Sequence, residues 1–185
     1  LTDLLHPCQA MADFSTIAQF MEPREATLAY VGDGNNVVNS LLLLAGVLGL
    51  RLKVATPSSH RPDAKVLARA EMLAEGSGAE ITLGEDPVEA VRGVDFVYTD
   101  TWTSMGQEAE AESRRKIFRE YQVNDGLLAY TDNARVMHCL PAHRGEEVTA
   151  AVLDGSQSVV FDQAENRLHA QNAILEHLLV RSFSC

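Results

Sequence analysis

A buried strand, a tight turn and a long apolar helix follow one another between residues 27 and 49, and this order constrains the fold most. Thr27 to Val31 has the composition and length of a buried strand. Gly32-Asp33-Gly34-Asn35-Asn36 predicts a turn, and Val37 to Leu48 predicts a helix that Gly49 ends. A second buried strand is predicted from Leu52 to Ala55. A strand–helix–strand order of this kind predicts two parallel strands.

The same alternation runs through the rest of the chain. Further strands are predicted at residues 81–83, 96–99, 136–139 and 159–161. Further helices are predicted at residues 4–20, 62–76, 87–91, 108–122 and 166–181. This alternation predicts an α/β fold: a doubly wound, mostly parallel sheet with helices on both faces, as in Rossmann-like domains.

Charge, hydropathy and cysteine usage narrow the class of protein. The chain has 185 residues, which fits one domain with an attached element. It carries 15 Lys and Arg against 26 Asp and Glu, a net charge of −11, so we expect neither nucleic acid nor a membrane surface as a partner. No apolar run reaches the roughly 18 residues of a spanning helix. Cys8, Cys139 and Cys185 are odd in number and widely spaced, which predicts a reducing compartment, the cytoplasm, rather than a disulfide framework.

Four chemically active side chains gather at the end of the predicted strand 136–139: His138, Cys139, His143 and Arg144. The carboxyl ends of parallel strands are where ligands bind, and Pro141 stops the strand there. Zinc is disfavoured because no second cysteine lies near Cys139 at the spacing of structural zinc sites, so we predict no metal. A nucleophilic Cys139 stays open, although no protease-like signature surrounds it.

The turn at residues 32–36 has two interpretations. Gly32-x-Gly34 after a strand suggests the phosphate turn of an NAD-dependent oxidoreductase. Val37 stands where that fingerprint needs a third glycine, and the second strand ends in Ala55-Thr56 without the acid that would bind the ribose. A turn whose asparagines face another ligand fits better, with helix capping as the explanation for one of the two asparagines.

Three further segments carry candidate binding residues. Asp100, at the end of strand 96–99, could pair with a substrate ammonium, and Ser104 could bind a small polar group or cap the next helix. His6 and Gln9 lie three residues apart at a helix start, where two neutral donors suit a carbonyl and a phosphate. Arg167 could hold a phosphate oxygen through its forked guanidinium.

Taken together, these motifs resemble those of the aspartate and ornithine carbamoyltransferase family, and of its ornithine-specific branch in particular. They are His-Pro-x-Gln at 6–9, Gly-Asp-Gly-Asn-Asn at 32–36, Asp-Thr-Trp-x-Ser-Met-Gly at 100–106, His-Cys-Leu-Pro at 138–141 and Glu-Asn-Arg at 165–167. The family's Ser-x-Arg-Thr phosphate motif is absent. We therefore expect a hinge helix within residues 1–22, an ornithine-binding α/β domain over 23–165 and a closing helix over 166–185, without the amino-terminal carbamoyl-phosphate domain.

The resemblance implies a reaction and a set of site residues. The reaction is carbamoyl transfer from carbamoyl phosphate to L-ornithine, which gives L-citrulline and phosphate without a cofactor. The residues implied for ornithine are Asn36, Asp100, Ser104 and Met105. Those implied for carbamoyl phosphate are His6, Gln9, Cys139, Leu140 and Arg167. Asp100 and Cys139 are implied as the catalytic pair beside the δ-amine.

Two expectations concern the chain by itself. The complete enzyme is expected to be a homotrimer, whereas this chain alone is expected neither to form the trimer nor to make citrulline. The missing Ser-x-Arg-Thr motif leaves a second interpretation open. In that interpretation the chain is a stand-alone amino-acid-binding or regulatory module that has lost the reaction.

Overall fold

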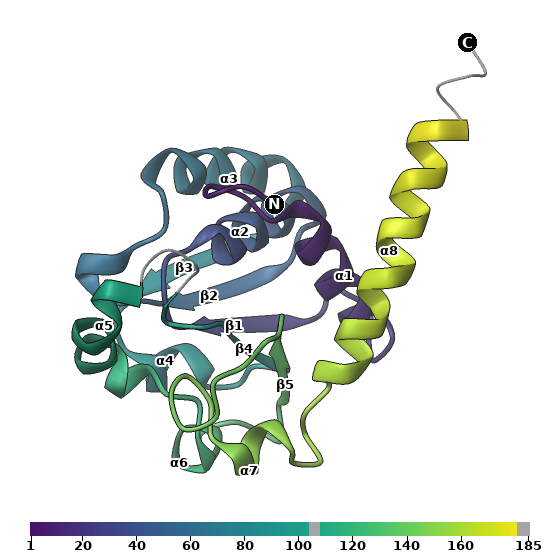
Figure 1. Cartoon of the computed structure of the whole chain (residues 1–185). Coiled ribbons are helices and arrows are strands. Elements are labelled where there is room, and N and C mark those ends of the chain that lie inside the picture. The colour runs from purple at the N-terminus through teal and green to yellow at the C-terminus, as the bar shows by residue number, and fades with distance from the viewer. Residues whose placement is uncertain (104–107, 181–185) are drawn as a thin grey trace.

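Five parallel strands form the centre of the molecule, as the computed structural model describes it for residues 1–103 and 108–180. The strands are β1 (Thr27–Val31), β2 (Arg51–Ala55), β3 (Glu80–Gly84), β4 (Phe96–Thr99) and β5 (Arg135–His138). Their order in the sheet is β3-β2-β1-β4-β5 (Figure 1). The predicted α/β fold class is confirmed, and the described sheet is parallel throughout.

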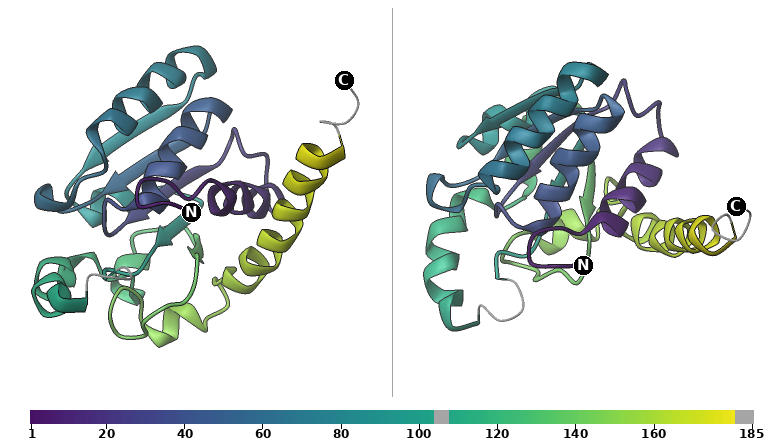
Figure 2. Two further views of the ribbon diagram at one scale, coloured as in Figure 1. Left: turned by 45° about the horizontal axis from the view of Figure 1, so that its top comes forward. Right: turned by 90° about the horizontal axis from the view of Figure 1, so that it is seen from above.

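Helices cover both faces of this sheet (Figures 1 and 2). The α-helices are α1 (Pro7–Ala18), α2 (Asn36–Leu48), α3 (Ala64–Ser77), α4 (Pro87–Val91), α5 (Ala111–Phe118), α6 (Asp125–Leu128), α7 (Ala150–Leu153) and α8 (Val160–Val180). Short 3-10 turns are η1 (Ser58–His60), η2 (Glu108–Glu110) and η3 (Arg119–Tyr121).

Alternating side chains of the strands build two cores. In β1, Leu28 and Tyr30 pack with α1, α2 and α3, whereas Ala29 and Val31 pack with α4, α5, α6 and α7. All four side chains are buried, because a strand covered on both faces has no solvated side. The apolar composition of this strand is continuous because helices cover the sheet on both faces.

The carboxyl-terminal part differs from the prediction. The predicted strand at 159–161 is wrong: Ser158 makes only an isolated bridge with Val136, and α8 begins at Val160. Val159 and Val160 are apolar because they enter the two cores at the start of this helix. The closing helix is thus longer than predicted, and the expected domain boundary at 165/166 falls inside it.

The first turns of helix α8 pack beside α1. Asn166 Nδ2 donates to Thr16 Oγ1 at 3.0 Å, and Gln19 Nε2 donates to Asn166 Oδ1 at 3.0 Å. Beyond this contact the helix leaves the body of the molecule (yellow in Figure 1). Within the described residues, no helix combines the length and apolar character needed to cross a bilayer.

The strand order places the functional site. The chain runs outward from β1 to β3, then returns to form β4 on the other side of β1. The segments that follow β1 and β4 therefore diverge at neighbouring carboxyl ends, and a crevice opens between them.

Candidate active site

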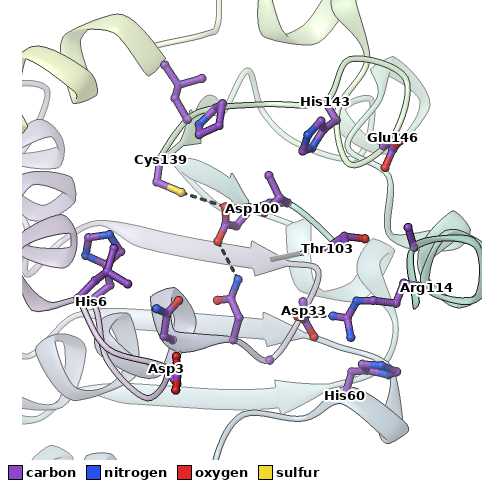
Figure 3. Close-up of a pocket in the computed structure, with 18 of the residues that line it drawn as sticks. Asp3, His6, Asp33, His60, Asp100, Thr103, Arg114, Cys139, His143 and Glu146 are labelled. Atoms are coloured by element: carbon purple, nitrogen blue, oxygen red, sulfur yellow. Dashed lines mark hydrogen bonds and ion pairs between the residues drawn. The ribbon is translucent and has the colours of Figure 1, made fainter. Parts of the chain in front are cut away.

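A cavity of about 1060 Å³ lies at this edge of the sheet (Figure 3). Its walls come from the segments that follow β1, β2, β4 and β5, from the amino-terminal residues, and from α5 and α8. Six residues predicted for the site line it: His6, Asn36, Asp100, Cys139, Leu140 and Arg167. Gln9 is not among the lining residues, and Ser104 and Met105 lie outside the part of the chain that the structure describes.

The turn after β1 requires both of its glycines. Gly32 has a φ of 144°, a backbone conformation that L side chains rarely adopt. A Cβ on Gly34 would lie 2.4 Å from the carbonyl oxygen of His60, so the two segments approach too closely for any side chain. The two glycines are thus explained by the path of the chain, without a dinucleotide.

The same turn orients Asn35. Its Oδ1 accepts the backbone N–H groups of Val37 and Val38 at 2.9 and 3.3 Å, so Asn35 is the capping residue of α2. This cap occupies amides that a pyrophosphate would need at a dinucleotide site. Asn36 is the first helical residue and lines the cavity, where its Nδ2 donates to the carbonyl of Thr2 at 2.7 Å. One asparagine therefore caps the helix and the other faces the cavity.

Asp100 is the negative group at the centre of the site. Its Oδ2 accepts from Asn35 Nδ2 at 2.7 Å, and its Oδ1 accepts from Thr101 N at 2.8 Å and from Cys139 Sγ at 2.9 Å (Figure 3). The side chain is buried yet borders the cavity. Three donors therefore fix one carboxylate between the ends of β1, β4 and β5.

Cys139 is held as a neutral thiol. Burial raises the pKa of the thiol well above its ordinary value, and the negative charge of Asp100 raises it further. A protonated thiol can donate to Asp100, which matches the observed contact. A thiolate nucleophile is the less stable form here.

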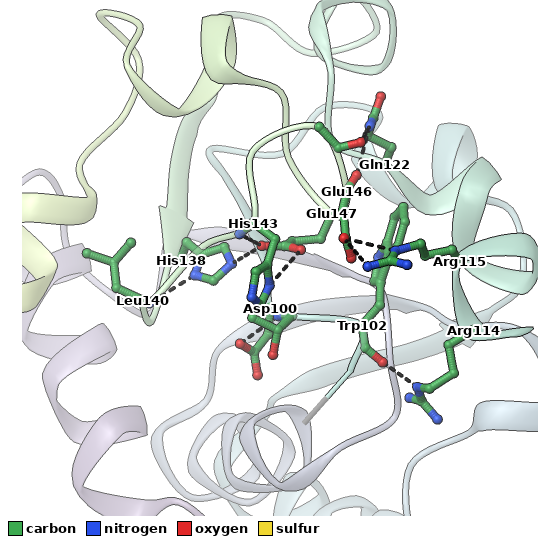
Figure 4. Close-up of polar contacts among 12 residues, drawn as sticks. Asp100, Trp102, Arg114, Arg115, Gln122, His138, Leu140, His143, Glu146 and Glu147 are labelled. Atoms are coloured by element: carbon green, nitrogen blue, oxygen red, sulfur yellow. Dashed lines mark hydrogen bonds and ion pairs between the residues drawn. The ribbon is translucent and has the colours of Figure 1, made fainter. Parts of the chain in front are cut away.

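His138 supports the segment that carries Cys139 and Leu140. Its ring is fully buried, and Nδ1 accepts the backbone N–H of Leu140 at 2.9 Å (Figure 4). The proton must then lie on Nε2, which is 3.1 Å from Glu147 Oε1. Glu147 thus fixes the tautomer of His138, a role that the sequence did not reveal.

Leu140 has a left-handed backbone, with a φ of 54°, and precedes a cis peptide bond to Pro141. For a residue with a side chain, a left-handed backbone costs on the order of 1–3 kcal/mol, and such strain is concentrated at functional sites. The hydrogen bond to His138 and the buried Glu147 hold the segment in place against this cost.

The opposite wall carries His6 and Arg167. Burial lowers the pKa of His6, and the positive charge of Arg167 lowers it further, so the imidazole is neutral at neutral pH. Its Nδ1 has no hydrogen-bond partner within the described ranges. Arg167 donates from Nη1 to Gln9 Oε1 at 2.8 Å, so Gln9 acts on the cavity through Arg167.

A buried ion pair between Asp33 and Arg114 was not predicted. Arg114 is only 5% exposed, although its helix reads as charged and solvated. The guanidinium donates to the carbonyl of Trp102 (Figure 4). It also donates to Asp33 Oδ2 and lies 5.2 Å from the ring centre of Phe118. Burial raises the pKa of Asp33 to about 6, against the opposing effect of Arg114. The pair ties the turn after β1 to α5.

Two clusters offer the donor types of a metal site. They are Asp100 with His138 and Cys139, and His143 with Glu146 and Glu147. Most of these donor atoms already take part in the hydrogen bonds described above or, for Glu146, in an ion pair with Arg115 at 2.8 Å. We therefore assign a metal to neither cluster.

Comparisons with known proteins cover almost the whole chain. Residues 24–178 match a family described as "Aspartate/ornithine carbamoyltransferase, Asp/Orn binding domain". The ornithine carbamoyltransferase of Archaeoglobus fulgidus is 52% identical over 181 residues, which are 97% of this chain and 58% of that protein. That of Thermococcus kodakarensis is 54% identical over 177 residues, 95% of this chain and 56% of that protein.

Solved structures give the same result. The ornithine carbamoyltransferase of Pyrococcus furiosus has a TM-score of 0.89 at 54% identity and covers 94% of this chain and 56% of its own. The anabolic enzyme of Campylobacter jejuni has a TM-score of 0.90 at 37% identity, over 95% of this chain and 59% of its own. The chain thus spans less than three fifths of the length of these relatives.

Proposed function

The chain belongs to the aspartate/ornithine carbamoyltransferase family, and from this we propose that it supplies the ornithine-binding half of an ornithine carbamoyltransferase. The observation that carries the proposal is Asp100, a buried carboxylate that borders the cavity and is fixed by three donors. Such a group can pair with an amine and orient it. In this proposal Asn36, Ser104 and Met105 hold the remaining polar groups of ornithine.

The proposed reaction needs no covalent bond to the protein. The δ-nitrogen of ornithine forms a bond to the carbamoyl carbon, the bond from that carbon to the phosphate oxygen breaks, and the amine loses a proton. The neutral imidazole of His6, the charged guanidinium of Arg167 and the Leu140 carbonyl would hold carbamoyl phosphate. Asp100 and the Cys139 thiol would orient the amine. Positioning and charge stabilisation supply the catalysis.

The proposal extends to the complete enzyme. The chain covers less than two thirds of its relatives, so we propose that the remaining part supplies further groups for the phosphate and the contacts of a homotrimer. The chain alone would then make little citrulline and form no trimer. The free thiols of Cys8 and Cys139 support the cytoplasm as its compartment.

Calorimetric titration of the chain tests the ligand. We expect heat on addition of L-ornithine and none with L-aspartate or NAD, and Asp100→Asn should weaken binding. Binding of NAD with no binding of ornithine would contradict the proposal. Turnover is tested in what we call the completed enzyme: this chain joined to the part of the Archaeoglobus fulgidus relative that it does not cover.

A further inference from the structure

Asp13 is a buried carboxyl group in the middle of α1, away from the cavity. Its side chain is 0% exposed. One oxygen, Oδ1, accepts from Gln9 Nε2 at 2.8 Å and from Gln163 Nε2 at 2.7 Å. The second oxygen, Oδ2, meets no donor with full hydrogen-bond geometry among the residues that the structure describes, and the nearby Tyr98 hydroxyl lowers the pKa of the carboxyl against the larger effect of burial. Asp13 therefore joins two amide side chains that lie more than 150 residues apart.

Each amide uses its other end to hold a part of the site. Gln9 Oε1 accepts from Arg167 Nη1 at 2.8 Å, and Gln163 Oε1 accepts the backbone N–H of His138 at 2.9 Å. An amide has one donor end and one acceptor end. Because both donor ends are bound at Asp13, both acceptor ends must face outward, toward Arg167 and His138.

The orientation does not depend on whether Asp13 is ionised. Burial raises the pKa of Asp13 to about 7, so both forms are populated near neutral pH. Since Oδ1 already accepts two N–H groups, a bound proton would reside on Oδ2. In either form, a flipped amide would set its carbonyl oxygen against Oδ1, an acceptor against an acceptor.

We infer that Asp13 is a positioning residue for carbamoyl transfer: through Gln9 and Gln163 it places Arg167 and the His138–Leu140 segment around one carbamoyl phosphate. The inference rests on the proposed function. It predicts that loss of the Asp13 acceptor disturbs two walls of the cavity at once, although Asp13 touches neither.

The competing explanation is that Asp13 only holds α1 against α8. Thr16 provides the matched control, because it is fully buried on the same helix and accepts from Asn166 of α8 at 3.0 Å. Among the described residues, the side-chain hydrogen bonds of Thr16 and Asn166 join them to each other, to Ala12 and to Gln19, and none of these residues lines the cavity. Thr16→Val therefore weakens the same helix pair without touching the Asp13 arrangement.

The first test is nuclear magnetic resonance of the 185-residue chain. The probes are the side-chain amides of Gln9 and Gln163 and the backbone amide of His138. In Asp13→Leu we expect all three signals to move, whereas Asp13→Asn, which keeps an oxygen at Oδ1, and Thr16→Val should leave the His138 signal near its original position. If Asp13→Leu fails to fold, Gln163→Leu replaces it. In that variant we expect the His138 signal to move and the Gln9 side-chain signal to stay in place, because the Arg167–Gln9 contact is retained.

The second test is kinetic, in the completed enzyme. Asp13→Leu should lower kcat/KM for carbamoyl phosphate roughly tenfold or more, as expected for a lost hydrogen bond to a charged group, with the KM for ornithine within about threefold. Asp13→Asn should restore most of this loss, and Thr16→Val should show none of it. The inference would be overturned if the three signals stayed in place in a folded Asp13→Leu chain. It would also be overturned if Asp13→Asn or Thr16→Val lowered kcat/KM for carbamoyl phosphate as much as Asp13→Leu does. A completed enzyme that makes no citrulline before any substitution counts against the proposed function instead, and the spectra still decide the positioning claim.

Discussion

The substitution Asp100→Asn has an effect that can be worked out from the hydrogen bonds around it. Asparagine has the same shape, but one of its two terminal atoms is an NH2 group. If the NH2 takes the place of Oδ2, it meets the Nδ2 of Asn35, a donor against a donor. If it takes the place of Oδ1, it meets the backbone N–H of Thr101, again a donor.

Asn35 cannot relieve this conflict by turning over. Its Oδ1 accepts the backbone N–H groups of Val37 and Val38, and a flip would leave both amides facing an NH2 group. One buried donor therefore loses its acceptor in either arrangement, at a cost of about 1–3 kcal/mol. Under the proposed function, the lost charge also removes the partner of the substrate amine.

The assay is L-ornithine binding to the chain by calorimetry, followed by ornithine kinetics in the completed enzyme. The donor conflict should lower the free energy of unfolding by the cost given above, about 1–3 kcal/mol. The lost contact to the amine should raise the Kd roughly 10- to 150-fold, which corresponds to the about 1.5–3 kcal/mol of a hydrogen bond to a charged group. Asp154→Asn is the control, because Asp154 pairs with Arg144 at an exposed site, where such pairs contribute about 0–1 kcal/mol. A folded Asp100→Asn protein that binds ornithine as tightly as the Asp154→Asn control would refute the assignment of Asp100.

Three further predictions concern the thiol, the buried acid and the turn. Cys139→Ser keeps a donor to Asp100, so we expect kcat of the completed enzyme to fall roughly tenfold and ornithine affinity to change much less; equal losses in both would contradict this. The folded pKa of Asp13, about 7, lies above its ordinary value of 3.8, so the native state binds the proton more tightly and stability is lost as pH rises from about 4 to 7. Denaturant titrations should show that the free energy of unfolding of the wild type falls by up to about 4 kcal/mol relative to that of Asp13→Asn over this pH range. If the two free energies change with pH in parallel, Asp13 is not buried as described. Gly34→Ala should abolish ornithine binding in the calorimetric titration, because the new Cβ has no room beside His60. Gly76→Ala is the control: the space around Gly76 is open, so this change should stabilise the chain by about 0.5–1 kcal/mol in denaturant titrations.

The fold was largely predictable because burial on two faces leaves a mark in the sequence. The strands at residues 27–31 and 96–99 have the predicted bounds, since their side chains are apolar on both faces. The same signal misled at residues 159–161, where Val159 and Val160 are buried at the beginning of a helix. An apolar run of three residues carries no information about which element buries it.

The lining of the cavity was predictable where side chains follow strand ends. Asn36, Asp100 and Cys139 converge because the strands before them are parallel neighbours. Arg114 and Asp13 were not predictable, because each is a charged residue in an amphipathic helix, where the ordinary expectation is a solvated face. Their burial depends on partners 81 and 150 residues away, Asp33 and Gln163, which only the folded chain brings together.

The central claim is that this chain contributes the ornithine half of a carbamoyl-transfer site. The most direct test is the rate of citrulline formation from carbamoyl phosphate and L-ornithine, measured for the chain alone, for the uncovered part of the Archaeoglobus fulgidus relative alone, and for the completed enzyme. We predict citrulline from the completed enzyme at a rate typical of enzymes, roughly 1–1000 per second, and negligible amounts from either part. A folded completed enzyme that binds ornithine but makes no citrulline, or equal turnover by this chain alone, would contradict the account.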